Sequence, residues 1–287
     1  MNEVSESSGV LLVKFDDYRV KVDNAISAEL NRLKDSIFFT PLKNALKGGK
    51  RLRPISLILS YESVGSQKMN PLPAAVAVEL AHTESLIHDD IIDRDPLRRE
   101  TSAFHALNGY EMALLSADFI LSIILDITAR YTDPRITLSL AKSASRMCEG
   151  ELEEYSVIKK GKRVSVDRYI KIIYKKTASL FEASAMIGAI IGGAAEDEVK
   201  ALLDYGRLIG IAYQIKDDIS DFDDSETTNI LSLLDTNAGR TEILEEMSAT
   251  YILEAKQRLE KLGESGAKAL LVELADFVRS NSIKGFL

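Results

Sequence analysis

Two clusters of aspartates are the residues of this sequence with the clearest chemistry. The first comprises Asp89, Asp90 and Asp93 in a DDxxD pattern, and Asp217, Asp218 and Asp221 repeat the pattern 128 residues later. Each cluster follows an apolar stretch. Hard carboxylate oxygens grouped in this way suit Mg²⁺ better than zinc. A single copy also fits a solvated surface, but two copies on neighbouring helices would share metal ions across a pocket mouth.

The first cluster lies on a predicted helix that must end close to it. At 100° per residue, His82, Asp89 and Asp93 fall within about 40° of one helix face. Pro96 predicts that the helix stops just before it, which places the carboxylates in the last turn. The helix dipole disfavours anions there by roughly 0.3–1 kcal/mol each. This placement indicates that a bound cation compensates for the carboxylates.

Basic residues accompany the acidic clusters. Arg98 and Arg99 follow the first cluster directly, and an arginine pair suits phosphate or carboxylate groups. The segment GGKRLRP, Gly48–Pro54, combines two glycines with three basic residues at the start of a predicted helix, which fits an anion site or a solvated loop equally well. Lys176 and Thr177 lie where a polar segment gives way to an apolar one. Together these residues predict a metal-bridged phosphate site.

Composition excludes several classes of protein. The chain has 287 residues, 46% of them hydrophobic, and a net charge of −8, which argues against broad nucleic-acid binding. Its one cysteine, Cys148, cannot form an intrachain disulfide, so we expect a reducing, cytoplasmic location and interpret Cys148 as core packing. The N-terminus lacks a signal-peptide pattern. The longest uncharged stretch, residues 183–195, is too short to span a bilayer and predicts a close-packed buried helix.

Hydrophobic periodicity predicts an all-α fold with a single domain over residues 1–287. No segment shows the alternation of a strand. The acidic run EGELEE, residues 149–154, is interpreted as a solvated helix face. Helices are expected over residues 11–33, 39–47, 55–64, 74–93, 111–131, 135–155, 167–195, 196–218, 242–262 and 266–281, with a loop or weak helix over 227–237.

Four motifs in order along the chain resemble a known family. They are GGKRLRP, HTESLIHDDIIDRDPLRR, KKTASLF and YQIKDDISDF, and they resemble the trans-isoprenyl diphosphate synthases, or polyprenyl synthetases, of the short-chain type. The resemblance implies a helical bundle around a deep central cavity, and a homodimer. It implies a Mg²⁺-dependent prenyltransferase that condenses isopentenyl diphosphate with an allylic diphosphate such as dimethylallyl, geranyl or farnesyl diphosphate. About three Mg²⁺ ions per active site would be held between the two acidic motifs.

The resemblance also implies roles for individual residues. Asp89 and Asp93 would be the main Mg²⁺ ligands of the first motif with Asp90 in support, and Asp217 would be the main ligand of the second, with Asp218 and Asp221 acting directly or through water. The diphosphate of isopentenyl diphosphate would be held by Lys50, Arg53, His82 and Arg99. The allylic side would be lined by Arg98, Lys176, Thr177 and Gln214. Of these residues, Asp89, Asp93, Asp217, Lys176 and Arg98 would act in catalysis.

The chemistry of such a reaction agrees with the residue types. Breaking an allylic C–O bond releases diphosphate, so Mg²⁺ and fixed cations would act electrostatically on the departing anion. No protein nucleophile is needed and none is evident. An apolar bundle would house the growing tail and exclude water from the carbocation. A geranylgeranyl-like product is favoured by analogy with single-chain members of this size.

The sequence departs from the family pattern at three places. Glu100 stands where a glycine commonly follows the arginine pair. The chain has no lysine between Lys216 and Lys256, although the family commonly carries a lysine segment after the second motif. Glu84 occupies the position, five residues before the first motif, whose size usually sets the depth of the tail pocket.

Two alternative functions stay open at this point. A terpene cyclase would usually lack a basic loop for a second diphosphate, so Lys50 and Arg53 argue against it. A catalytically weak subunit that regulates an active partner fits the missing lysine segment. Both complete DDxxD motifs weigh against that second alternative, because a pure scaffold has no use for them.

Overall fold

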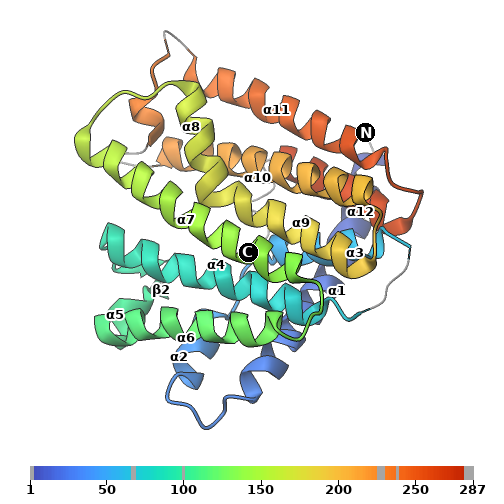
Figure 1. Cartoon of the computed structure of the whole chain (residues 1–287). Helices are drawn as coiled ribbons and strands as arrows, with labels where there is room; N and C mark the ends of the chain where they lie inside the picture. The colour runs from blue at the N-terminus through green and yellow to red at the C-terminus, as the bar shows by residue number, and fades with distance from the viewer. Residues whose placement is uncertain (1–2, 66–68, 99–100, 225–229, 237–238, 281–287) are drawn as a thin grey trace.

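The computed structural model describes residues 3–65, 69–98, 101–224, 230–236 and 239–280, and in these ranges the fold is all-α, as predicted (Figure 1). The elements are α1 (Glu3–Asn31), α2 (Phe39–Ala45), α3 (Leu52–Glu62), α4 (Leu72–Asp93), β1 (Leu97–Arg98), β2 (Thr101–Ser102), α5 (Phe104–Asn108), α6 (Tyr110–Thr128), α7 (Pro134–Lys160), α8 (Val166–Ile173), the π-helical turn η1 (Tyr174–Ala178), α9 (Ser179–Gly192), α10 (Glu196–Asp224), the 3₁₀ turn η2 (Ile230–Leu233), α11 (Arg240–Leu259) and α12 (Gly266–Arg279). The β1–β2 hairpin was not predicted, because two-residue strands show no alternation.

Helix α9 forms the centre of the bundle, packed against α3, α7 and α10. Nearly all of its side chains are buried, as expected for a helix that is apolar on every face. A Cβ atom on Gly188 would come within 2.1 Å of the carbonyl oxygen of Leu57 in α3, so the two backbones are in direct contact. This confirms the prediction of a close-packed buried helix. A search of the described residues finds no helix long and apolar enough to cross a membrane.

Helix α4 ends where the sequence predicted. Its last residue is Asp93, and the next residue, Arg94, adopts a left-handed conformation with φ of 60°. Pro96 then prevents any continuation of the helix. The first acidic motif therefore occupies the C-terminal end of α4. The helix dipole is negative there and does not offset the charge of the carboxylates.

Helix α10 runs past the second acidic motif, contrary to the expected end at Asp218. It continues to Asp224, so Asp217 lies about two turns before its end. The prediction was wrong because nothing local stops the helix: the last proline of the chain is Pro134. The two acidic motifs thus differ in their position along their helices.

The predicted helix over residues 167–195 is three consecutive segments. A π-helical turn, η1, separates α8 from α9 and contains Lys176 and Thr177. Such turns are rare and often lie at functional sites. Gly150 of α7 lies directly against η1, and a Cβ atom there would come within 2.5 Å of the backbone nitrogen of Lys176. The close approach of α7 and η1 therefore depends on the absence of a side chain at position 150.

Candidate active site

One cavity of about 510 Å³ brings the basic loop and both acidic motifs together. Of the residues with predicted roles, its walls include Lys50, Arg53, His82, Asp89, Arg98, Lys176, Thr177, Gln214, Asp217 and Asp221. Asp90, Asp93 and Asp218 are not among its lining residues, and Arg99 lies outside the described residues. The ten residues that line it come from α3 and the loop before it, α4, β1, η1 and α10.

The first motif carries more negative charge than its surroundings neutralise. Burial, and then the nearby Glu151 carboxylate, raise the pKa of Asp89 to about 7, while Lys176 and Arg98 oppose the shift only in part. Burial and Glu151 also raise the pKa of Asp93. Carboxylates that resist ionisation in this way are stabilised by a bound cation. The first motif therefore has the electrostatics of a cation site.

The donor set fits ions that are shared with a phosphate. Among the described residues, no three His, Cys, Asp or Glu side chains converge closely enough to hold a metal by themselves. Mg²⁺ usually keeps several waters and takes one or two carboxylates plus substrate phosphates. Asp89 and Asp217, on opposite helices around one cavity, match that mode of binding.

Asp90 turns away from the main cavity and holds Arg98. The Asp90 side chain is 3% exposed, and the Arg98 guanidinium donates to its Oδ1 atom at 2.6 Å. Arg98 lines the main cavity, whereas Asp90 lies on a separate cavity behind it. The second aspartate of this motif therefore orients an arginine toward the cavity.

In the second motif too, one aspartate lines the cavity and another orients neighbouring side chains. Asp218 is buried and accepts hydrogen bonds from Tyr169 at 2.6 Å and from Gln214 at 2.7 Å. Gln214 in turn accepts from the hydroxyl of Thr177 at 2.6 Å. Asp218 thus orients Gln214 and Thr177 at the cavity wall, whereas Asp217 lines the cavity itself. Sequence reasoning did not find Tyr169, because it lies 49 residues from its partner.

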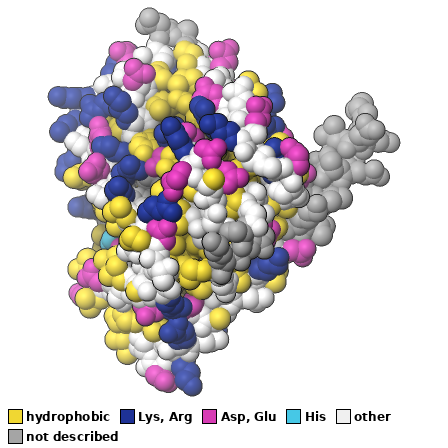
Figure 2. Space-filling view, turned by 45° about the vertical axis from the view of Figure 1, so that its right-hand side comes forward, with side chains coloured by type: hydrophobic (Ala, Val, Ile, Leu, Met, Phe, Trp, Pro, Cys, Tyr) yellow, Lys and Arg dark blue, Asp and Glu magenta, His cyan; other side chains and the backbone are white. Residues whose placement is uncertain are grey.

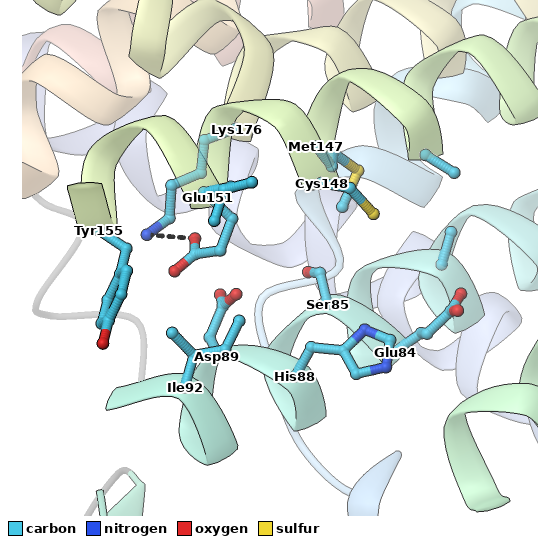
Figure 3. A pocket seen from close by; sticks show the side chains of 13 residues that line it. Glu84, Ser85, His88, Asp89, Ile92, Met147, Cys148, Glu151, Tyr155 and Lys176 are labelled. Atoms are coloured by element: carbon cyan, nitrogen blue, oxygen red, sulfur yellow. Dashed lines mark ion pairs between the residues drawn. The ribbon is translucent and has the colours of Figure 1, made fainter. Parts of the chain in front are cut away.

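Lys176 is held by two glutamates of α7 that the sequence analysis misplaced. Its ammonium lies 2.7 Å from Glu151 Oε2 and also forms an ion pair with Glu154. In Figure 3, Glu151 points toward both Lys176 and Asp89. Burial lowers the pKa of Lys176, but Glu154 and Glu151 more than offset this and raise it overall. The interpretation of EGELEE as a solvated face was wrong for these two residues. Their spacing of three, in register with buried Met147, was the available signal.

The cations of the basic loop differ in their contacts. Lys50 and Arg53 line the main cavity, and the Arg53 guanidinium lies 4.6 Å from the centre of the Phe181 ring. Arg51 also lines this cavity, but its side chain is only 4% exposed and its guanidinium pairs with Glu79 and Asp23. The family resemblance assigned Lys50 and Arg53, and not Arg51, to diphosphate binding, whereas residue type and spacing alone do not separate the three.

A second cavity of about 430 Å³ adjoins the first and is mostly apolar. The two share Ser85, Asp89, Met147 and Lys176 as lining residues. The further walls come from α4 and α7 and comprise Ala81, Glu84, His88, Ile92, Ala144, Cys148, Glu151, Leu152 and Tyr155 (Figure 3). The interpretation of Cys148 as core packing was wrong, since this residue is exposed and lies on the cavity wall. A polar mouth therefore leads into an apolar space, with Asp89 at the junction.

Comparison with known proteins identifies the family. A family model described as polyprenyl synthetase matches residues 35–250, which is most of the chain. The chain belongs to the polyprenyl synthetase family. This polyprenyl synthetase is 33% identical over 279 residues to geranylgeranyl diphosphate synthase of Methanosarcina mazei, a match that covers 81% of this chain and 86% of that protein. It is 34% identical over 280 residues to the short chain isoprenyl diphosphate synthase of Methanothermobacter thermautotrophicus, with 80% and 86% covered.

The fold agrees with the family assignment. The crystal structure of geranylgeranyl pyrophosphate synthetase from Pyrococcus horikoshii superposes with a TM-score of 0.84 at 28% identity, and covers 96% of this polyprenyl synthetase and 99% of that chain. The resemblance noted from the four motifs is confirmed, as is the helical fold that it implied. This polyprenyl synthetase is a prenyltransferase, an enzyme of prenyl chain elongation.

Proposed function

We propose that this polyprenyl synthetase condenses isopentenyl diphosphate with an allylic diphosphate, in a Mg²⁺-dependent reaction, to give a short all-trans prenyl diphosphate. One observation carries the proposal: a polar cavity lined by two acidic motifs and a basic loop opens into an apolar cavity at Asp89. A substrate with a diphosphate head and a hydrocarbon tail matches both parts. A purely polar or a purely apolar ligand would match only one of the two cavities.

Mg²⁺ fits the carboxylates around the main cavity. Asp89 and Asp93 would hold it at the end of α4, and Asp217 and Asp221 would hold it from α10, with about three ions expected from the family. Bound Mg²⁺ neutralises negative charge on a departing diphosphate. Asp90 and Asp218 would support these ligands, because their oxygens already accept hydrogen bonds from Arg98, Tyr169 and Gln214.

The chain's own cations would hold the two diphosphates at fixed places. Lys50, Arg53 and His82 line the main cavity and suit the head group of isopentenyl diphosphate. Arg98 and Lys176 also line it and act on the charge of Asp89, so they suit the allylic diphosphate. These charges are held in place before the C–O bond breaks, which is the arrangement that lowers the energy of charge separation.

The apolar cavity would take the allylic tail and keep water from the carbocation. Its walls are formed by α4 and α7, and it begins at Asp89, where the head group would lie. A geranylgeranyl-like product is favoured, because a relative with that named product is 33% identical. A geranylfarnesyl diphosphate synthase of Methanosarcina mazei is 31% identical, so overall similarity separates the two product lengths only narrowly.

A homodimer is proposed from one exposed apolar face. On α6, Tyr110, Leu114, Leu121 and Leu125 recur at helical spacing and are 56%, 59%, 44% and 53% exposed. Figure 2 shows hydrophobic side chains on the lower part of the molecule, the level at which Figure 1 has α5 and α6. Exposed apolar patches of this kind mark association surfaces. A second copy of the chain is the occupant that the family implies.

The direct test is turnover by the purified protein. With Mg²⁺, isopentenyl diphosphate and allylic primers of increasing length, we expect prenyl diphosphates that chromatography can size. Asp89→Ala and Asp217→Ala should lower kcat by orders of magnitude while circular dichroism shows an intact fold, because neither residue packs in the core. Asp35→Ala, which removes an exposed carboxylate between α1 and α2, is the control and should keep full activity.

Two results would contradict the proposal. Near-wild-type turnover by Asp89→Ala would remove the metal assignment. Absence of product with every primer would remove the elongation activity and favour a regulatory subunit. A binding measurement completes the experiment: Mg²⁺ with pyrophosphate at 100 times its Kd should add about 2.7 kcal/mol to the free energy of unfolding.

A further inference from the structure

The basic loop before α3 has an unusual backbone. Gly48 and Gly49 have φ of 75° and 99°, and Arg51 has φ of 54°. Among the described residues, only Arg51 and Arg94 combine a side chain with a positive φ. A left-handed conformation costs an ordinary L-residue roughly 1–2 kcal/mol. Some interaction of the Arg51 side chain must therefore hold the loop in this form.

The guanidinium of Arg51 is bound by three different elements. Its Nε donates to Asp23 Oδ1 of α1 at 2.9 Å, and its Nη1 donates to Glu79 Oε1 of α4 at 2.5 Å. Its Nη2 donates to the carbonyl oxygen of Leu46, the residue that caps α2. The planar guanidinium has its donors in a fixed geometry, so these contacts also fix its orientation.

The position of Glu79 links this anchor to the active site. Glu79 is 5% exposed and lies one turn before His82 and almost three turns before Asp89, all on α4. Lys50 and Arg53 flank Arg51 in the chain, and all three residues line the main cavity together with Glu79. The Arg51–Glu79 pair therefore joins the cations of the loop to the helix that carries the first acidic motif.

A buried ion pair is a poor source of stability, since the cost of removing two charges from water offsets their attraction. An apolar pair of similar volume would stabilise the fold at least as well. What the pair supplies is geometry, because neither partner can turn away without leaving a buried charge unpaired. The ion pair thus fixes the distance between the basic loop and helix α4.

We propose that Arg51 is a positioning residue for diphosphate binding. Its guanidinium already donates to Asp23, Glu79 and Leu46, so it acts by fixing the loop. Lys50 and Arg53 then meet the head group of isopentenyl diphosphate at a defined distance from Asp89. This inference rests on the proposed function. It assigns the three cations of the loop two different tasks, with Arg51 acting through its neighbours.

Two variants test the inference without leaving a buried charge unpaired. Arg51→Lys keeps the positive charge but loses the planar guanidinium with its fixed donors. The double variant Arg51→Met/Glu79→Met replaces the ion pair by apolar side chains. Both should fold, and both should raise KM for isopentenyl diphosphate about tenfold or more, since a charge-assisted contact is misplaced. KM for the allylic primer and kcat should change less than about threefold.

A matched control separates positioning from general stability. Arg130, in the turn after α6, makes a two-pronged ion pair with Glu29 of α1 at 2.6 and 2.9 Å, and neither residue lines the cavities described above. Arg130→Met should lower the melting temperature and leave both KM values unchanged. If the Arg51 variants behave like Arg130→Met, with a lower melting temperature and an unchanged KM, the positioning role is overturned.

Calorimetric titration with isopentenyl diphosphate separates this inference from the proposed function. If the wild-type protein makes product and the Arg51 variants bind isopentenyl diphosphate as tightly as it does, only the role of Arg51 fails. The wild-type protein could make no product and still bind isopentenyl diphosphate, with both Arg51 variants binding it more weakly. In that case the proposed activity fails and the positioning role stands.

Discussion

Glu84 places an ionisable group on the wall of a largely apolar cavity. Burial, followed by the charge of Asp118 on α6, raises the pKa of Glu84 from 4.5 to about 7. Because the unfolded chain releases this proton at lower pH than the folded protein, stability falls as pH rises from about 4.5 to about 7. The other ionisable groups near it are His88 of α4 and Cys148 of α7.

Glu84→Gln should therefore change the pH dependence of stability. The variant cannot ionise at this position, so its melting temperature should exceed that of the parent above pH 7 and match it near pH 4.5. A melting series from pH 4.5 to 8, with Glu111→Gln as a control at an exposed site, checks this. Parallel curves for the parent and Glu84→Gln would show that the carboxylate is not destabilised by its surroundings.

The same side chain controls how far a tail can extend, if the apolar cavity holds the tail. Glu84→Phe should fill the space one turn below Asp89 and shift products to shorter chains. Glu84→Ala should open that space and remove a polar group from the path of the tail, which lengthens products. Glu84→Gln keeps the volume and should keep the product spectrum. Chromatographic sizing of products decides, and an unchanged spectrum in the Phe and Ala variants would remove Glu84 as the determinant.

At the level of single residues, the sequence predicted which side chains meet but not how each is oriented. Asp89 and Asp217 could be recognised because their motif repeats, and both line the cavity. Glu151 could not be placed, because a run of glutamates on a helix does not show which members face inward. Cys148 was misplaced for the same reason: its exposure depends on where α4 lies relative to α7.

The junction between α7 and η1 tests how the position of an element controls the site. Gly150→Ala places a methyl group within 2.5 Å of the Lys176 backbone, so η1 must move away from α7. We expect a loss of about 1–3 kcal/mol in the free energy of unfolding, as is usual for overpacking. We also expect kcat to fall, because Lys176 and Thr177 move with η1.

Gly188→Ala is the control for this prediction, since its methyl group would meet Leu57 at 2.1 Å in the packed interior. It should lower stability without a specific effect on kcat at temperatures well below its melting point. Denaturant unfolding and single-turnover rates, measured on both variants, separate the two effects. Full activity in a folded Gly150→Ala protein would mean that Lys176 does not need its present position.

At the level of elements, helix boundaries could be predicted wherever a local signal exists. Pro96 and Pro134 mark the end of α4 and the start of α7 in the sequence and in the structure. The end of α10 could not be predicted, because no proline or glycine interrupts the second motif. The π-helical turn at Lys176 also left no trace in the periodicity, since it depends on contact with Gly150 of another helix.

For the whole molecule, the exposed apolar face of α6 predicts the assembly. Leu121→Glu with Leu125→Glu puts two charges on that face, so a dimer should dissociate to monomers. Leu253→Glu, at a residue of α11 that is 59% exposed and outside the face, should leave the dimer intact. Sedimentation equilibrium gives the mass of each. A wild-type protein that sediments as a monomer would contradict the proposed homodimer.

The position of Cys148 has a practical consequence. It is the only thiol in the chain, it is exposed, and it lies on the wall of the apolar cavity opposite α4. A thiol-directed fluorophore or spin label would therefore attach at one known point without any prior mutagenesis. Its signal would report directly whether the hydrocarbon compartment is filled, independently of any turnover.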